Sequence, residues 1–285
     1  MNYSETYHAG TQILSDAGIS EAALDARLLL EFITGEGLNT LLAHPDTSVS
    51  AQNEERYKKI LEKRAQHIPL SYLTGESFFM GIRLGVNENV LIPRQDSECL
   101  VEEAMRYVED ASSVLDLCTG SGCLLLALMH YKNNISGIGV DISDKAVKTA
   151  AENAAYLETE GALNGGKAEF FQGDLYDALA PDAKFEYLIS NPPYIRSGLI
   201  PTLMPEVRDH EPHIALDGGE DGLDIYRRIA QGAHKHLRKH GMIFLEIGYD
   251  QSEDVTAVLD EYGFADITTI KDYCDNDRVI TAKMK

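Results

Sequence analysis

The sequence predicts an α/β protein with a doubly wound, mostly parallel sheet and a small N-terminal helical domain. From about residue 114, short apolar runs typical of buried strands alternate with helical segments, which is the pattern of βαβ units around a parallel sheet. The first seventy or so residues show helical periodicity instead. We therefore expect a helical domain over residues 1–75, a β-hairpin linker over 76–95 and an α/β domain over 96–285.

Two helices account for most of the predicted N-terminal domain. Ser20 is a candidate N-cap for the first, because a serine hydroxyl can accept a hydrogen bond from the free N–H groups of a first helical turn. The second helix is expected from about Ala51 to Gln66, and the short β-prone segments over 78–91 predict the hairpin. The side chains expected to face the core are Leu24, Leu28 and Phe32 in the first helix and Tyr57, Ile60 and Leu61 in the second.

The predicted strands of the α/β domain locate the candidate site. In open α/β sheets, ligands bind beyond the carboxyl ends of the strands. The residues that follow each strand are therefore the first candidates for ligand contact. Strands are expected near residues 114–117, 138–141, 168–172, 187–190, 242–247, 267–270 and 279–282.

A glycine-rich turn, Cys118-Thr119-Gly120-Ser121-Gly122, follows the first of these strands and precedes an apolar helical stretch. Glycine lets the backbone approach a ligand closely, and the start of a helix presents free N–H groups. Leu125 stands where the dinucleotide fingerprint G-x-G-x-x-G needs its third glycine, and the chain has no G-K-[ST] sequence. The turn therefore favours a nucleoside ligand that lacks a pyrophosphate.

Acids end the second and third strands. Asp141 lies about 20 residues beyond the glycines, where nucleotide-binding sheets hold a ribose diol. Gly173-Asp174-Leu175 ends the third strand, which would place Asp174 and Leu175 beside an adenine. The alternative for Asp174 is an exposed loop acid. Together with the glycine turn, these positions favour S-adenosyl-L-methionine as the cofactor.

The fourth strand ends in Asn191-Pro192-Pro193-Tyr194. The two prolines stop the strand and fix the backbone φ angles. The side-chain carbonyl of Asn191 and a neighbouring backbone carbonyl can then point rigidly into a cleft. Two convergent acceptors suit a planar –NH2 group, which occurs on adenine, cytosine, asparagine and glutamine. The alternative is an ordinary strand-ending turn, because Asn-Pro commonly starts one.

With these motifs in this order, the chain resembles the class I methyltransferases of the N-methylating [Asn/Asp]-Pro-Pro-[Tyr/Phe/Trp] type. Within them it is similar, over nearly its whole length, to the peptide chain release factor glutamine methyltransferases. Cys118, Gln95 and Ser97 stand where this family frequently has glycine, proline and threonine. The further stretches that carry the resemblance are 69–75, 91–98, Glu211-Pro212 with Ala215-Leu216, and Asp272-Tyr273 with 275–279.

The resemblance implies a Rossmann-like class I methyltransferase fold with an antiparallel last strand. It also implies methyl transfer from S-adenosyl-L-methionine to the side-chain amide N5 of the glutamine in the Gly-Gly-Gln motif of release factors. The N-terminal domain would help to grip that protein substrate. Arg94 is either a site residue, since its stretch borders the cofactor pocket in the family, or a surface arginine. The residues expected to bind the cofactor are Cys118, Thr119, Gly120, Ser121, Gly122, Asp141, Asp174, Leu175 and Asn191.

The expected catalytic residues are Asn191, Pro192 and Tyr194. Asn191 and the backbone carbonyl of Pro192 would each accept one N–H of the glutamine amide. Tyr194 would form one wall of the pocket. These residues and Pro193 together form the expected substrate-binding segment. No metal is expected; His234, His236 and His240 precede Gly241 and are read as cations at a helix C-terminus closed by a glycine.

Charge disfavours nucleic acid as the substrate. The net charge is −21 at pH 7, and both predicted domains are acidic. Proteins that bind DNA or RNA usually carry a basic footprint that neutralises phosphates. The four cysteines show neither zinc-type pairing nor a disulfide framework, and no apolar run approaches the ~20 residues of a membrane span. We expect a cytoplasmic enzyme, a monomer as the family implies, with no direct contact to nucleic acid or membrane.

Three alternatives stay open at this stage. A ribosomal-protein glutamine methyltransferase would share the same catalytic motif. An adenine-N6 DNA or RNA methyltransferase would also use it, but would need a basic groove. The third alternative is a cofactor-binding scaffold without catalysis, which a turnover assay would distinguish from an active enzyme.

Overall fold

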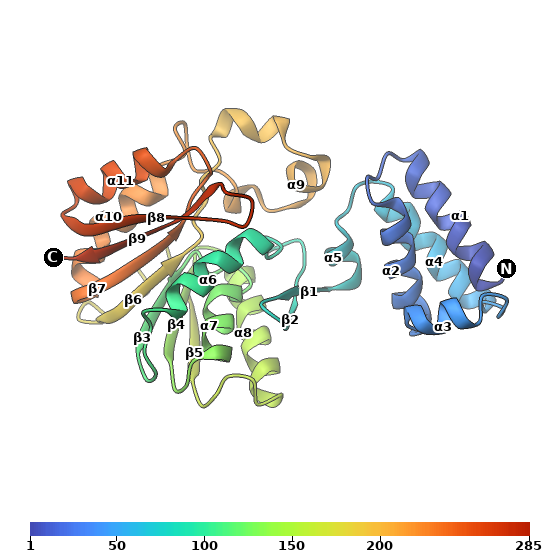
Figure 1. Cartoon of the computed structure of the whole chain (residues 1–285), viewed down its shortest axis with the longest axis horizontal. Helices are drawn as coiled ribbons and strands as arrows, with labels where there is room; N and C mark the ends of the chain where they lie inside the picture. The colour runs from blue at the N-terminus through green and yellow to red at the C-terminus, as the bar shows by residue number, and fades with distance from the viewer. The chain divides into compact units, whose positions relative to one another are not determined.

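The computed structural model describes residues 1–285, which divide into two compact units (Figure 1). One unit comprises Met1–Glu76 and Met204–His210, and the other comprises Ser77–Leu203 and Glu211–Lys285. This division differs from the predicted boundaries in two places. Most of the predicted linker belongs to the α/β unit, and a short segment from the middle of the chain belongs to the helical unit.

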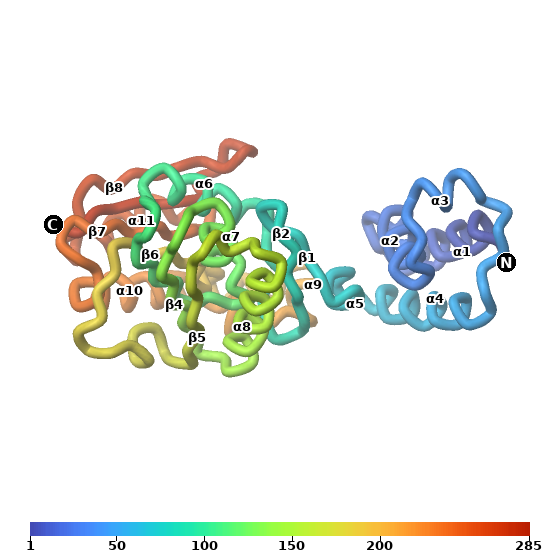
Figure 2. The backbone as a smooth tube through the Cα atoms, turned by 90° about the horizontal axis from the view of Figure 1, so that it is seen from below, coloured from blue at the N-terminus to red at the C-terminus, as the bar shows by residue number.

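The helical unit is a small bundle in which α1, α2 and α4 lie side by side (Figure 1, Figure 2). Asn2 caps α1 with a capping box, since its side chain accepts from the Glu5 N–H while the Glu5 carboxylate accepts from the Asn2 N–H. Leu14, Leu30 and Leu61 are among the side chains that fill the core. The helices of this unit are α1 (Tyr3–Asp16), α2 (Ala22–Thr34), α3 (Leu38–Ala43), α4 (Ala51–Arg64), α5 (Leu70–Thr74) and α9 (Pro205–His210).

The prediction for α2 was wrong in its cap and in its buried face. The helix begins at Ala22 after Glu21, and no side chain caps it. Leu24 and Phe32 are exposed, because the face that packs on the bundle is the one that also carries Asp25. Apolar residues surround much of this helix, so their spacing alone did not select the buried face. The predicted inward residues of α4, Tyr57, Ile60 and Leu61, are confirmed as buried.

A buried ion pair lies on the inward face of this helix. Arg64 Nε donates to Asp25 Oδ2 at 2.7 Å, and both side chains are 8% exposed. A second guanidinium nitrogen of Arg64 donates to Glu206 of α9 at 3.1 Å. Nδ1 of His67 also lies 3.1 Å from Glu206, and Nε2 of His210 lies 2.9 Å from the Gln66 carbonyl. These contacts attach α9 to the helical unit.

The α/β unit is built on a seven-stranded sheet with the strand order β5-β4-β3-β6-β7-β9-β8. The pairs from β5 to β7 are parallel, whereas β9 is antiparallel to both of its neighbours. All seven predicted strands and the antiparallel last strand are confirmed. The strands are β3 (Ser113–Leu117), β4 (Ser136–Asp141), β5 (Lys167–Gln172), β6 (Phe185–Ser190), β7 (Leu237–Glu246), β8 (Phe264–Lys271) and β9 (Asp277–Met284).

Helices cover both faces of this sheet (Figure 1). Alternate strand residues point to opposite faces: Val114 and Ile189 pack in the core with α6, α7 and α8, whereas Leu115 and Leu188 pack in the core with α10 and α11. The helices are α6 (Glu98–Met105), α7 (Cys123–Tyr131), α8 (Asp144–Thr159), α10 (Asp224–His236) and α11 (Ser252–Glu261). The remaining elements are the hairpin β1 (Glu76–Phe79) with β2 (Ile82–Gly85), and the 3-10 turns η1 (Gln95–Ser97), η2 (Ser197–Thr202) and η3 (His213–Ala215).

The prediction for the histidine cluster was wrong about the helix end. Helix α10 ends at His236, and β7 begins at Leu237, which pairs with Phe185 of β6. His240 and Gly241 therefore lie in a strand, and His240 shares no helical face with His236. No cluster of three or more His, Cys, Asp or Glu residues is arranged to bind a metal ion. No helix combines the length and apolar character that a membrane span requires.

Candidate active site

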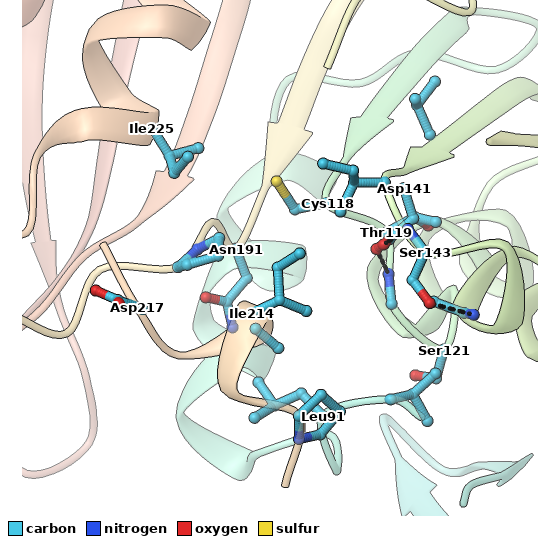
Figure 3. Close-up of a pocket in the computed structure, with 18 of the residues that line it drawn as sticks. Leu91, Cys118, Thr119, Ser121, Asp141, Ser143, Asn191, Ile214, Asp217 and Ile225 are labelled. Carbon is cyan, nitrogen blue, oxygen red and sulfur yellow. Dashed lines mark hydrogen bonds between the residues drawn. The ribbon is translucent and has the colours of Figure 1, made fainter. Parts of the chain in front are cut away.

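A cavity of about 680 Å³ lies at the carboxyl ends of the central strands (Figure 3). It is lined by residues at or directly after the ends of four strands: 118–121 after β3, 141–143 at the end of β4, 173–175 after β5, and Asn191 with Pro193 after β6. Parallel strands bring all these ends to one edge of the sheet, as the sequence predicted. The rest of the lining comes from residues 89–97, 212–219 and 224–228, together with Cys123, Leu124, Val140 and Ala146.

The glycine turn after β3 bends sharply into the cavity. Cys118, Gly120 and Gly122 all have positive φ angles, of 57°, 56° and 80°. Gly122 precedes α7, and a Cβ atom there would lie 3.2 Å from Ala150, so this glycine permits close packing and does not itself line the cavity. Cys118 adopts a conformation that favours glycine. The turn therefore adopts a backbone conformation that favours glycine even though residue 118 is a cysteine.

Asp141 is the central acceptor on the cofactor side of the cavity. Its Oδ2 accepts from the Gly120 N–H and its Oδ1 from the Ser143 N–H, both at 2.9 Å. Burial raises the pKa of Asp141, and these backbone hydrogen bonds oppose that rise. Each carboxyl oxygen keeps a lone pair after its backbone bond. The fixed carboxylate can thus accept the two hydroxyls of a ribose.

Behind the turn lies a second, fully buried acid, Asp116 of β3. Thr119 Oγ1 donates to Asp116 Oδ2 at 2.6 Å, and burial raises the pKa of Asp116 to about 7. The neighbouring Ser121 hydroxyl is buried in the cavity wall without a hydrogen-bond partner in the protein. Buried polar groups normally have partners, so a polar ligand would satisfy Ser121. These residues fit the polar part of a nucleoside cofactor.

Asp174 and Leu175 also line the cavity. Asp174 pairs with Arg228 of α10 at 2.8 Å, and both side chains are partly exposed. Leu175 is buried and has a φ angle of 56°. An apolar side chain next to an acceptor suits the face and the amino group of an adenine.

Asn191 lies on the same cavity, next to Pro193. Its Nδ2 donates to Ser97 Oγ at 3.2 Å, and its Oδ1 has no donor within the protein. The carbonyl of Pro192 likewise accepts no hydrogen bond from the protein. Both acceptors are therefore unpaired within the protein, and Asn191 is the one of these two residues that lines the cavity.

Pro192 and Tyr194 do not line the cavity. Pro192 is buried, and the Tyr194 hydroxyl donates to Glu246 Oε1 at 3.3 Å. Burial, followed by the charge of Glu246, raises the pKa of Tyr194 above its ordinary range. The tyrosine thus connects the segment to the end of β7.

The loop after η3 holds the Asn191–Tyr194 segment in place. Ile195 donates its N–H to the Leu216 carbonyl at 3.0 Å and accepts from the Gly218 N–H at 2.9 Å. The Gln251 side chain donates to the Tyr194 carbonyl at 3.1 Å. Because Gly218 packs directly on the backbone of Tyr194, a Cβ there would lie 2.7 Å from the Tyr194 Cα.

Arg94 lines the cavity, and its guanidinium pairs with the buried carboxyl of Glu211. Burial raises the pKa of Glu211, and the charge of Arg94 opposes this rise. The residues that follow Glu211 also border the cavity, including Ile214 of η3 (Figure 3). Arg94 therefore fixes one wall of the site.

Several residues of the site were not predicted. Asp217, Ile225 and Arg228 line the cavity from elements that lie far along the sequence from the motifs. Glu246 lies under Tyr194, and its position at the end of a predicted strand was the only available signal. Ser97 was noted in the resemblance but was given no role.

Two family models match this chain: the PrmC N-terminal domain over residues 5–75 and the methyltransferase small domain over residues 95–203. A release factor glutamine methyltransferase of Caulobacter vibrioides is 40% identical over 97% of this chain and 94% of its own length. The chain belongs to the release factor glutamine methyltransferase family. A relative with the same name from Agrobacterium fabrum is 38% identical over 96% of this chain and 94% of its own length.

Structural comparison agrees on the fold of this methyltransferase family member. A 16S rRNA N2 G1207 methyltransferase of T. thermophilus, solved with AdoMet and guanosine, has a TM-score of 0.50 and 20% identity, covering 74% of this chain and 50% of that chain. This likeness shows the fold alone, because one fold can carry many different functions. The predicted family, the class I methyltransferase fold, the enzyme class and S-adenosyl-L-methionine as the cofactor of the family are confirmed.

Proposed function

We propose that this protein transfers a methyl group from S-adenosyl-L-methionine to the side-chain amide N5 of the glutamine in the Gly-Gly-Gln motif of peptide chain release factors. The observation that carries the proposal is that Asn191, with a free Oδ1, shares one cavity with Asp141 and the glycine turn. A nucleoside held at Asp141 and an amide held at Asn191 would meet in that cavity.

On the cofactor side, Asp141 would bind the ribose hydroxyls and Ser121 a polar group of the cofactor. Asp174 and Leu175 would face the adenine. The backbone of Cys118, Thr119 and Gly120 would run along the cofactor. Gly122 would allow the turn to pack closely. S-Adenosyl-L-methionine supplies an electrophilic methyl group on a sulfonium when it is bound.

On the substrate side, the protein must expose the lone pair of a poorly nucleophilic amide nitrogen. Asn191 Oδ1 and the Pro192 carbonyl would each accept one amide N–H and so turn the nitrogen lone pair toward the methyl group. Positive charge develops on nitrogen as the methyl transfers, and the two fixed carbonyl dipoles stabilise it. Holding both reactants in line supplies a further part of the rate. Pro193 and Tyr194 would keep the segment rigid.

Three observations support a release factor as the substrate. The relatives that match nearly the whole chain carry that name. The N-terminal helices match a domain of the same family and would form the substrate-recognition domain. The net charge of −21 disfavours nucleic acid. The proposal takes residues 1–75 as the recognition domain, 76–95 as the linker and 96–285 as the catalytic domain of a cytoplasmic monomer.

Transfer of labelled methyl from S-adenosyl-L-methionine tests this proposal. The acceptors are a purified release factor, its Gly-Gly-Gln glutamine-to-alanine version, a ribosomal-protein fraction and an adenine-containing duplex. Label should enter only the intact release factor. Label in the ribosomal proteins or the duplex would overturn the assigned substrate.

The residue assignment is tested by Asn191→Ala. This variant should lose about 10²- to 10³-fold in kcat, the usual effect of removing one preorganised hydrogen-bonding group that stabilises the transition state, while still binding the cofactor. Asn133→Ala is the matched control, because its side chain bonds Asp110 outside the cavity. Activity of Asn191→Ala within a few-fold of the wild type would contradict the mechanism.

A further inference from the structure

A chain of buried polar groups lies directly behind Asn191. The Asn191 Nδ2 donates to Ser97 Oγ at 3.2 Å, and Ser97 is 2% exposed. The Ser97 hydroxyl also lies close enough to the Glu246 carboxyl, at the end of β7, to lower its pKa. Tyr194 donates to the same carboxyl at 3.3 Å. Tyr194 is thus bonded to Glu246, and Asn191 is bonded to the serine that lies beside Glu246.

Glu246 is buried, and only one of its two carboxyl oxygens accepts a hydrogen bond. Its Oε1 accepts from Tyr194, and its backbone carbonyl accepts from the Tyr226 hydroxyl at 2.7 Å. Oε2 is buried and has no hydrogen-bond partner in the protein. A serine hydroxyl rotates freely to suit its surroundings. Turned toward Oε2, the Ser97 proton would satisfy that oxygen, and the lone pairs of Ser97 would then face Asn191.

We propose that Ser97 and Glu246 are positioning residues that fix which way the Asn191 carboxamide faces. This inference rests on the proposed function, since it concerns the acceptor that Asn191 offers to the substrate amide. When Glu246 is ionised it only accepts hydrogen bonds, so a Ser97 hydroxyl turned toward it donates and is left to accept from Asn191. Asn191 can provide that donor only through Nδ2, which leaves Oδ1 toward the cavity.

The orientation matters because the two ends of a carboxamide have opposite hydrogen-bonding character. A flipped Asn191 would present its NH2 group to the NH2 group of the substrate, which places two donors against each other. The flipped state would neither bind the amide nor stabilise the positive charge that develops on nitrogen. Without Ser97, nothing else in the structure bonds the Asn191 amide and selects one orientation.

The position of Ser97 is itself fixed from the opposite side. Ser97 ends η1, and the preceding residue, Asp96, pairs with the Arg278 guanidinium at 3.2 Å. Arg278 also donates to the buried Asp272 at 3.1 Å and to the Ile247 carbonyl at 3.4 Å. The last sheet hairpin thereby holds η1 against β7. This contact gives a role to the stretch from Asp272 to Arg278, which the glutamine chemistry does not otherwise use.

The test compares Ser97→Ala with Ser97→Thr in the labelled-methyl assay on the release factor. Ser97→Ala should lower kcat about 10- to 100-fold, the range seen when the hydrogen-bond partners that orient metal-binding side chains are removed. The dissociation constant for S-adenosyl-L-methionine should not change. Ser97→Thr keeps the hydroxyl and should retain most of the activity. Ser112→Ala, another buried serine outside the cavity, is the control for truncation itself.

A double-mutant cycle separates positioning from general structure. If Ser97 acts through Asn191, then Ser97→Ala should cause no further loss in an Asn191→Ala background. Glu246→Gln keeps the volume but can turn an NH2 group toward Ser97, and it should lower kcat in the same way. A loss from Ser97→Ala that persists in the Asn191→Ala background would overturn the proposal, and so would wild-type kcat in Ser97→Ala or in Glu246→Gln.

The cycle also separates this inference from the proposed function. If the wild-type protein does not methylate the release factor, the proposed function fails. If it does so and the Ser97 and Glu246 variants behave like the wild type, only the positioning role fails.

Discussion

Gly218 packs so closely on the Asn191–Tyr194 segment that a single methyl group there should disable the enzyme. An alanine Cβ would lie 2.7 Å from the Tyr194 Cα, 2.8 Å from its carbonyl carbon and 2.9 Å from the Pro193 oxygen. Carbon atoms in good contact lie about 3.5–4.0 Å apart, so the two backbones must separate by roughly 0.8 Å. All three atoms belong to backbone, which cannot turn aside as a side chain can. Overpacking of this kind costs about 1–3 kcal/mol.

The displacement should be costlier for catalysis than for folding. A misplacement of about 1 Å can cost ~10²-fold in rate, so Gly218→Ala should lower kcat by about that factor while the protein stays folded. Steady-state kinetics with the release factor and a thermal unfolding curve measure the two effects. Gly198→Ala is the matched control, since no atom lies within 4 Å of its added Cβ. A Gly218→Ala enzyme with wild-type kcat would show that the close approach does not position the segment.

Three further substitutions test the cofactor site, the buried acid and the helical unit. Asp141→Asn should weaken S-adenosyl-L-methionine binding about 10- to 100-fold by calorimetry, because hydrogen bonds to a charged group contribute ~1.5–3 kcal/mol; unchanged affinity would remove Asp141 from the cofactor site. Burial raises the pKa of Glu246 from 4.5 to about 7, so the folded state holds this proton more tightly than the unfolded state does, and the associated stability is lost as pH rises through 7. Glutamine does not ionise, so the Glu246→Gln variant lacks this loss. The difference in free energy of unfolding between the variant and the wild type should therefore rise by ~2–3 kcal/mol, in favour of the variant, between pH 5 and pH 8; denaturant titrations in which this difference does not change with pH would contradict the raised pKa. Arg64→Ala leaves Asp25 buried and unpaired and should destabilise the helical unit by ~3–5 kcal/mol. Lys59→Ala breaks an exposed pair with Glu55 and should cost under ~1 kcal/mol; equal effects in thermal unfolding would show that burial does not decide the cost.

Strands and motif positions could be predicted from the sequence because each depends on local pattern. A buried parallel strand is a short apolar run, and the residues after it must lie at one edge of the sheet. This is why Asp141, Asp174 and Asn191 were predicted to lie together, and the cavity contains all three. The glycine turn was equally local, since Gly120 and Gly122 mark its positive φ angles.

The errors concern contacts between distant parts of the chain. Ser20 matches a cap by its type, yet the turn before α2 placed Glu21 at that position. The inward face of α2 packs against distant helices and includes Asp25, whose partner Arg64 is 39 residues away. Ser97 and Glu246 meet Asn191 and Tyr194 only through tertiary packing, so no spacing in the sequence could reveal their roles.

The attachment of α9 to the helical unit means that neither unit corresponds to a continuous piece of the chain. A fragment ending at residue 76 would lack Glu206, and Arg64 would lose one of its two acidic partners. A fragment that begins after residue 76 would carry α9 without the helices that it bonds. Limited proteolysis or deletion at the predicted boundary would therefore not release two intact modules, and truncation phenotypes of this chain report on both units at once.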